Sequence, residues 1–262
     1  MTPIRVTTAA FCAVLALSQP SFAELICTEA GPQTPRDITN TAGTNMADFA
    51  FAPAPEAMNL CNIHTHTNAE HKGPGFSMFV NNSAHGGYAC NETEDLTATE
   101  LDPSADGDVK AGNTIEVHWV FTTCEPGDPP GLGACLCDMD DLAVRVETQV
   151  FLVVNDDSAL DFASFGRNME AGDGVHQPKA LPTGTGTPVK FRGSTTGPDY
   201  DNFICSPFGV TWSVRPQCAK VSAASVNAWL EDADNFYKEH HSHGVRKLVT
   251  RPAYLSPIST GH

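Results

Sequence analysis

Residues 62–72 read Asn-Ile-His-Thr-His-Thr-Asn-Ala-Glu-His-Lys, with two histidines separated by one residue. The stretch begins inside a window, residues 60–66, in which side-chain character alternates roughly by two, the period of a β-strand. Side chains on one face of a strand repeat every second residue, so His64 and His66 project together, about 6.5–7 Å apart along the backbone. That spacing allows two imidazoles to bind one ion with nitrogen–zinc distances of about 2 Å.

A second strand pattern, Ile-Glu-Val-His-Trp at residues 115–119, places Glu116 and His118 on one face. If the two strands are neighbours, His118 supplies a third ligand, and three protein nitrogens leave the fourth position open, as in catalytic zinc sites. Asn62 and Glu116 each precede a histidine by two residues and are candidate acceptors for its second ring N–H. A His-x-His pair alone is equally typical of surface or core histidines, but the second strand favours a metal site.

The rest of the sequence predicts a mainly β protein. Residues 142–154 and 209–214 are typical of further strands, and Gly- and Pro-rich loops separate the strand candidates. Only residues 223–237 have a helical pattern, and residues 24–57 are expected to form an extended N-terminal arm. Hydrophobic residues make up 41% and charged residues 18% of the chain, which indicates a globular rather than a disordered protein.

The first 23 residues are typical of a cleaved signal peptide. Arg5 gives a short basic start, residues 8–18 are small and apolar, and Ser21 and Ala23 are small residues at the positions that a signal peptidase reads. The apolar run is too short to span a bilayer, and no later run reaches the roughly 18 residues needed. We expect a secreted or periplasmic protein without a membrane span, with residues 24–262 as one domain.

Nine cysteines become eight when Cys12 leaves with the signal peptide. An even number in an oxidising compartment favours disulfides over zinc thiolates, but eight cysteines allow about 105 pairings, so counting does not settle them. The formal charge of −16 argues against nucleic acid and anionic membranes as partners, because both need a positive surface. The acidic balance is interpreted as a solubilising surface, and the sequence indicates no oligomeric state.

The motif at residues 62–72, together with Glu-Val-His-Trp at residues 116–119, resembles the delta-class carbonic anhydrases. Further segments are similar to the alpha class, especially its bacterial secreted members. They are Cys27 with Gly-Pro-Gln-Thr-Pro at residues 31–35, Gly-Ser-Thr-Thr-Gly-Pro at residues 193–198, Cys205 with Val-Thr-Trp-Ser-Val at residues 210–214, and Arg251-Pro252. Because these segments follow the alpha-class order, the resemblance covers nearly the whole chain after the signal peptide.

The resemblance implies a zinc-dependent carbonic anhydrase, a lyase whose small-molecule substrate, CO2, is hydrated reversibly to bicarbonate by zinc-bound hydroxide. It also implies a single, mainly β domain with a twisted, mostly antiparallel central sheet like that of the alpha class, and few short helices. By position, His64, His66 and His118 match the zinc ligands of the family, and Asn62 and Glu116 match the acceptors that orient them. Thr195 and Glu70 match the catalytic threonine and the glutamate that accepts its hydrogen bond. Cys27 and Cys205 match the two cysteines of a disulfide.

The chain departs from the alpha-class pattern at two places. No residue matches the leucine expected just before the catalytic threonine, so Thr196 is an alternative to Thr195. The interval before His64 in which the alpha class has its usual proton shuttle holds no histidine, and His85, in a Gly-rich loop, is a candidate shuttle by chemistry alone. The histidine-rich run at residues 239–243 is interpreted as a solvated loop rather than as a metal site.

Two other functions fit parts of the pattern. His64, His66 and Glu70 have the His-x-His-x3-Glu spacing of cupins, and His118 would complete a four-ligand iron or manganese site in an oxygenase or a binding protein. The two glycines expected around that cupin motif are absent from this sequence. The other alternative is a catalytically inactive secreted carbonic anhydrase relative whose histidines hold a structural metal.

Overall fold

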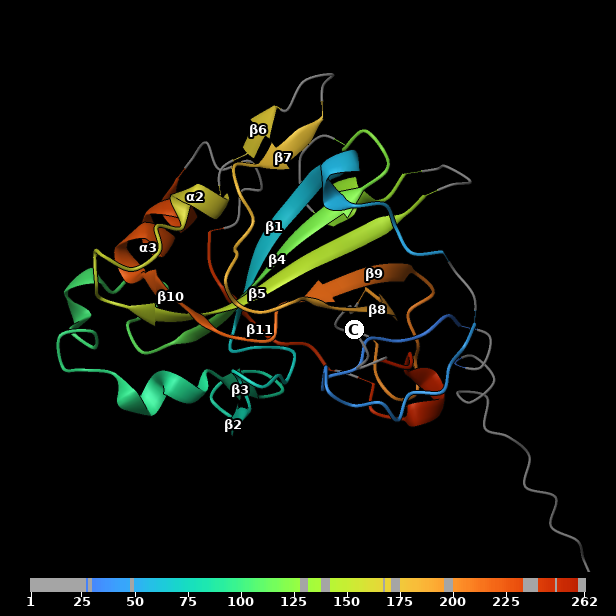
Figure 1. Ribbon diagram of the computed structural model, residues 1–262, viewed down its shortest axis with the longest axis horizontal. Helices are drawn as coiled ribbons and strands as arrows, with labels where there is room; N and C mark the ends of the chain where they lie inside the picture. Colours follow the sequence, from blue (N-terminus) through green and yellow to red (C-terminus); the bar gives the residue numbers. More distant parts are fainter. Residues whose placement is uncertain are drawn as a thin grey trace, which may run out of the picture.

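A mixed β-sheet of seven strands runs through the part of the protein that the computed structural model describes (Figure 1). The described residues are 27, 30–47, 50–127, 132–137, 142–166, 168–170, 175–195, 200–232, 240–247 and 249–258. The predicted signal peptide, residues 1–23, lies outside them. Among the described residues, no helix combines the length and the apolar character needed to cross a membrane.

The strands lie side by side in the order β11, β1, β4, β5, β9, β8, and β10 pairs with β5. Their bounds are β1 (Asn59–Thr67), β4 (Thr114–Thr122), β5 (Val144–Val154), β8 (Val189–Ser194), β9 (Gly209–Val214), β10 (Ala219–Ser222) and β11 (His243–Gly244). Two small antiparallel pairs are β2 (Met78–Val80) with β3 (Gly87–Ala89) and β6 (Asn168–Glu170) with β7 (His176–Pro178). The helices are α2 (Ala163–Gly166), α3 (Ala223–Glu231) and the short 3-10 turns η1 (Pro55–Ala57), η2 (Asn91–Asp95), η3 (Pro103–Ala105), η4 (Leu132–Cys135) and η5 (Pro252–Tyr254).

Strand pairing in the large sheet is mixed. The pairs β1–β4, β4–β5 and β8–β9 are antiparallel and are the longest, whereas β5–β9, β5–β10 and β1–β11 are parallel. The predicted mainly β fold with few short helices is confirmed, and the sheet is mixed rather than purely antiparallel. The expected helix at residues 223–237 is present as α3, which ends at Glu231, and residues 233–237 lie outside the described part.

One face of the sheet packs against α2 and α3 (Figure 1). Alternation along the strands points Ile63 of β1, Val117 and Trp119 of β4 and Phe151 of β5 to this face, where all four are buried. α2 and α3 cover them with aromatic and aliphatic side chains, among them Trp229. Burying this much apolar surface removes it from water, so this layer is one of the two hydrophobic cores that hold the sheet in place.

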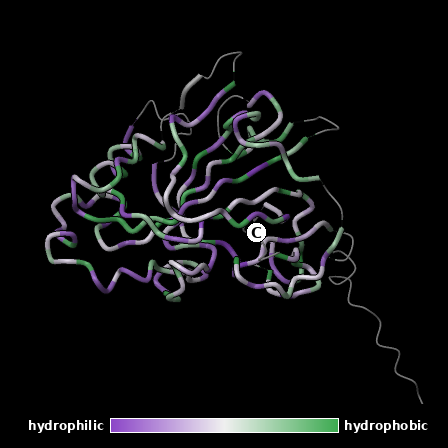
Figure 2. The backbone as a smooth tube through the Cα atoms, viewed as in Figure 1, coloured by the Kyte–Doolittle hydropathy of each residue, from purple (hydrophilic) through white to green (hydrophobic). Residues whose placement is uncertain are grey.

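The other face carries polar side chains at its centre. On β1 and β4 the residues that alternate with the first core are Asn62, His64, His66, Glu116 and His118, and all five are buried. Figure 2 shows hydrophilic segments within the central strands as well as on the outer loops. A second hydrophobic cluster on this face surrounds the polar group. Because buried polar atoms cost free energy unless they find partners, these five residues identify the candidate site.

Four disulfides connect the described segments, namely Cys27–Cys205, Cys61–Cys135, Cys90–Cys218 and Cys124–Cys137. Cys135 and Cys137, two residues apart, thus pair with different partners, as expected for structural disulfides. Within the predicted N-terminal arm, the described residues form isolated bridges, such as Gln33 to Leu255, and the turn η1. These crosslinks hold the arm and the C-terminal segments against the sheet.

Candidate metal centre

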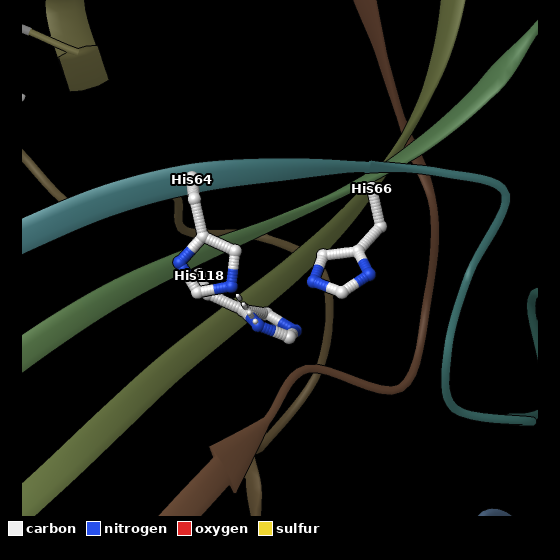
Figure 3. A group of neighbouring side chains, drawn as sticks. All are labelled: His64, His66 and His118. Atoms are coloured by element: carbon white, nitrogen blue, oxygen red, sulfur yellow. Dashed lines mark hydrogen bonds between the residues drawn. The ribbon is translucent and has the colours of Figure 1, made fainter. Parts of the chain in front are cut away.

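Three histidines from two adjacent strands meet on the polar face of the sheet (Figure 3). β1 and β4 are antiparallel with His64 directly opposite His118, and directly opposed residues share a face. His66 lies two residues along β1, on the same face. One ring nitrogen from each of the three histidines lies within 4.8 Å of the others. Adjacent strands and the strand period of two thus produce a group of three imidazoles.

The outward nitrogens of two of these histidines are held by acceptors. His64 Nδ1 lies 2.7 Å from Asn62 Oδ1, and His118 Nε2 lies 2.7 Å from Glu116 Oε1. An amide oxygen and a carboxylate oxygen only accept hydrogen bonds, so each outward nitrogen carries the hydrogen and donates it. The inward nitrogens, His64 Nε2 and His118 Nδ1, therefore present lone pairs to the centre of the group.

Those two inward nitrogens lie 3.1 Å from each other. With both ring hydrogens directed outward, no hydrogen is left to join them, and two facing lone pairs repel. A tetrahedral zinc ion with nitrogen distances of about 2.0–2.1 Å separates its ligand nitrogens by about 3.3 Å. The separation of His64 Nε2 and His118 Nδ1 therefore fits a shared cation, which removes the repulsion.

His66 supplies the third nitrogen. Its Nδ1 lies 3.4 Å from Glu70 Oε2, while its buried Nε2 has no hydrogen-bond partner among the described residues. A buried polar atom without a partner costs about 1–3 kcal/mol, and a metal ion would remove that cost. The donor set of three imidazoles, free of thiolates, suits zinc.

The ligand candidates are held in the form that binds metals. Burial lowers the pKa of His64 and of His66 well below the usual histidine value, and the charges of neighbouring His118 and His243 lower both further. Both rings are therefore neutral near pH 7, and only a neutral imidazole has a lone pair for a metal.

Glu116 connects the site to a fourth histidine, His71. Its Oε1 accepts from His118 Nε2 at 2.7 Å and from His71 Nδ1 at 2.6 Å, and its Oε2 accepts from the His71 backbone N–H at 3.0 Å. Burial alone would raise the pKa of Glu116, but the charge of His71 and the hydrogen bonds from both histidines hold it well below its usual value. Glu116 is thus an ionised carboxylate that fixes the orientation of two buried rings.

A small pocket opens over the three histidines. It is lined by His64, His66, His118, Val120, Leu132, Val146, Thr195, Trp212 and Arg246. The Trp212 ring contacts the rings of His118 and His71 edge-on, with centroid distances of 5.1 and 5.0 Å. The pocket lining therefore combines apolar side chains with the rings of the three histidines.

Of the two predicted catalytic residues, Thr195 is a pocket-lining residue and Glu70 is not. Thr195 lines the pocket, and its hydroxyl lies 3.2 Å from the hydroxyl of Ser206. Glu70 is fully buried beside His66. The hydrogen bond expected between Thr195 and Glu70 stays a prediction, and the alternative threonine, Thr196, lies outside the described residues.

Two histidines outside the predicted ligand set, His85 and His243, have different positions relative to the site. His85, the candidate shuttle, is exposed, has a positive φ of 66° and is not among the pocket-lining residues. His243, interpreted from sequence as part of a solvated loop, lies in β11 opposite His66, with 4.6 Å between their ring centroids. Sequence reasoning missed His243 because a two-residue strand leaves no periodic signal, although the cluster of histidines at 240–243 was visible.

A family model described as delta carbonic anhydrase matches residues 55–225 of the chain. Among solved structures, the chain is similar to an alpha-carbonic anhydrase from Photobacterium profundum, with 18% identity over 86% of this chain and 88% of that one and a TM-score of 0.32. It is also similar to alpha-carbonic anhydrase from Thermovibrio ammonificans in complex with the inhibitor sulfanilamide, with 15% identity over 87% and 91% of the two chains and a TM-score of 0.30. No curated protein matches significantly.

Proposed function

The chain belongs to the delta carbonic anhydrase family, and on that premise we propose that it hydrates CO2 reversibly to bicarbonate with zinc as its cofactor. His64, His66 and His118 would hold the metal. The observation that carries the proposal is the 3.1 Å approach of His64 Nε2 to His118 Nδ1, two nitrogens whose ring hydrogens are both directed away. A metal ion is the simplest group that stabilises this arrangement.

The protein's own contribution is to keep the three imidazoles neutral and oriented. Asn62 and Glu116 hold the outward ring hydrogens of His64 and His118, which fixes the tautomer of each ring. When bound, zinc supplies Lewis acidity that lowers the pKa of water in its open position to about 7. Three neutral ligands suit that chemistry, because they leave the charge of the ion undiminished.

The apolar side of the pocket is proposed to bind CO2. Val120, Val146 and Trp212 lie beside the three histidines and present no hydrogen-bonding groups except the indole N–H, which donates to the Ser194 carbonyl at 3.2 Å. A neutral, nonpolar gas gains from such a surface, whereas water does not. Dissolved CO2 would thus lie next to the metal position.

Thr195 and Glu70 are proposed as the catalytic pair. Thr195 supports this role because it lines the pocket, and its hydroxyl both donates and accepts hydrogen bonds and so is able to orient an attacking oxygen. Glu70, buried beside His66, is the proposed acceptor for the threonine hydroxyl. Glu70→Gln should retain zinc and lose hydration rate if Glu70 acts through Thr195, whereas loss of the metal would support a cupin-like ligand role.

We also propose that the protein is exported and that residues 1–23 are removed as a signal peptide. The four disulfides support this, because such bonds persist in oxidising compartments. Sequencing the N-terminus of protein recovered from outside the cytoplasm tests the expected cleavage after Ala23.

The test of the main proposal is stopped-flow CO2 hydration with metal analysis on the wild type and His118→Ala. We expect about one zinc per chain and catalysis in the wild type, and loss of both in His118→Ala. His240→Ala, which removes an exposed histidine, is the matched control and should behave as the wild type. A wild type that holds zinc without accelerating hydration would refute the proposed activity.

A further inference from the structure

One pocket-lining residue, Arg246, comes from residues 240–247, far in sequence from the strands that carry the ligand candidates. β11 within this segment pairs with the end of β1. The backbone N–H of Ser242 donates to Asp108 Oδ2 at 2.7 Å, which fixes the segment at a second point. The segment is therefore held against the site, and with it Arg246, whose side chain lines the pocket.

Arg246 differs from the buried arginines Arg145 and Arg215. Arg145 and Arg215 both pair with Glu147, at 2.7 and 3.1 Å. Half-buried Arg246 has no ion pair and no side-chain hydrogen bond with any residue in the described ranges. This is notable in a chain with 31 acidic residues against 15 lysines and arginines. A guanidinium offers five N–H donors in a planar fork that fits planar oxyanions, so an unpaired one in a pocket points to an anionic ligand.

Arg246 adds a charge to a pocket that also has an apolar lining. Among the described pocket-lining residues, it is the one permanently charged side chain, and the apolar ones include Val120, Val146 and Trp212. Arg246 lines the same pocket as His64, His66 and His118, where a hydration product would form.

We propose that Arg246 binds bicarbonate, as a positioning residue that holds two oxygens of the planar anion with its guanidinium fork. The inference rests on the proposed function and adds the group that recognises the charged reactant, since neutral CO2 gains little from a guanidinium. Bicarbonate is the product of hydration and the substrate of the reverse reaction. Arg246 is thus expected to set the affinity for bicarbonate while leaving metal binding to the histidines.

The experiment measures the Kd of bicarbonate for the zinc-loaded protein by calorimetric titration, at constant ionic strength and at a pH where bicarbonate predominates. Arg246→Gln should weaken binding about tenfold, the lower end for a charge-assisted hydrogen bond, because the site is partly open to water. Arg246→Lys should lie between that variant and the wild type, since it keeps the charge and loses the fork.

Lys247→Gln is the matched control, because it removes one positive charge from the next residue. Lys247 is exposed, and its ammonium lies 3.8 Å from Asp201. We expect its bicarbonate Kd to stay within about twofold of the wild type, since exposed charges interact weakly through water. An equal loss in Lys247→Gln would overturn the proposal in favour of a general charge effect.

Zinc content is measured on every protein, which separates the outcomes. An Arg246→Gln protein that holds zinc and binds bicarbonate as tightly as the wild type would overturn the proposal and leave the proposed function intact. A wild type that holds zinc without hydrating CO2 would refute the proposed function, while the bicarbonate titration, which needs no turnover, still decides the role of Arg246. If Arg246→Gln loses zinc, the Arg246→Lys protein tests the proposal instead. Weaker bicarbonate binding with unchanged chloride binding would support recognition by the guanidinium fork. Unchanged bicarbonate binding would contradict it.

Discussion

Replacing Glu116 with glutamine should disable the metal site while nearly preserving the shape of the side chain. In the wild type, Oε1 accepts from two ring N–H groups, those of His118 and His71, and Oε2 accepts from the His71 backbone N–H. An amide has one accepting oxygen and one donating NH2 group. If the amide oxygen takes the place of Oε1, the NH2 group faces the backbone N–H of His71, and two donors oppose each other.

The opposite orientation of the amide is worse for the metal. The NH2 group then faces His118 Nε2, and His118 must move its ring hydrogen to Nδ1, the atom that faces His64. A protonated Nδ1 has no lone pair for an ion. Both orientations lose at least one charge-assisted hydrogen bond in a fully buried position, so we expect a loss of about 1.5–3 kcal/mol in the free energy of unfolding.

The assay is zinc affinity by competition with a chelator, together with urea unfolding of the metal-free protein. We expect zinc affinity to fall about 10–100-fold, as is usual when a partner of a ligand histidine is removed. Glu147→Gln is the control: Glu147 is also buried, but it pairs with Arg145 and Arg215 on the opposite face of the sheet. It should destabilise the fold and leave zinc affinity unchanged. Wild-type zinc affinity in Glu116→Gln would refute this reasoning.

Three further perturbations have outcomes that follow from contacts in the structure. Gly193→Ala should lower the free energy of unfolding by about 1–3 kcal/mol in a urea titration, because the new Cβ would lie 2.7 Å from Cδ1 of Trp212. Asn62→Leu should weaken zinc about tenfold in a chelator competition, because it removes the acceptor for the histidine two positions later. The hydrogen bond from Lys220 is the main cause that lowers the pKa of Glu100 to about 2. A carboxyl group whose pKa is lower in the folded than in the unfolded state stabilises the fold when it is ionised. For Glu100 this contribution is complete above the unfolded pKa of about 4.5 and is lost as the pH falls toward the folded pKa of about 2. The difference in urea midpoint between the wild type and Glu100→Gln should therefore shrink between pH 6 and pH 2.5.

The polar face of the sheet is the part of the site most accessible from sequence. His64, His66 and His118 lie within two strands whose residues alternate clearly, and a period of two fixes which side chains share a face. Side-chain alternation does not determine which strand is the neighbour or the register of the pairing. His64 lies directly opposite His118 because β1 pairs with β4 in antiparallel fashion, and the alternation in these two strands does not specify that pairing.

The contributions of distant segments are harder to predict. His243 and Arg246 reach the site only because β11 pairs with β1 across more than half of the chain, and a strand of two residues has no periodicity of its own. The hydrogen bond between Glu116 and His71 depends likewise on the path of the segment after β1, which brings His71 to the carboxylate. The parallel pairings of β5 arise from the path of the connections, which side-chain alternation does not determine.

The most direct measurement is oxygen-18 exchange between CO2 and water at chemical equilibrium, followed as zinc is added to the metal-free protein. Exchange reports the interconversion of CO2 and bicarbonate itself, so it tests the three-histidine site independently of the proton shuttle. We predict that the exchange rate rises with added zinc, levels off at about one equivalent and stays at the uncatalysed rate in His118→Ala. Zinc bound at one equivalent with no faster exchange, or equal exchange in His118→Ala, would contradict the assignment of CO2 hydration to this site.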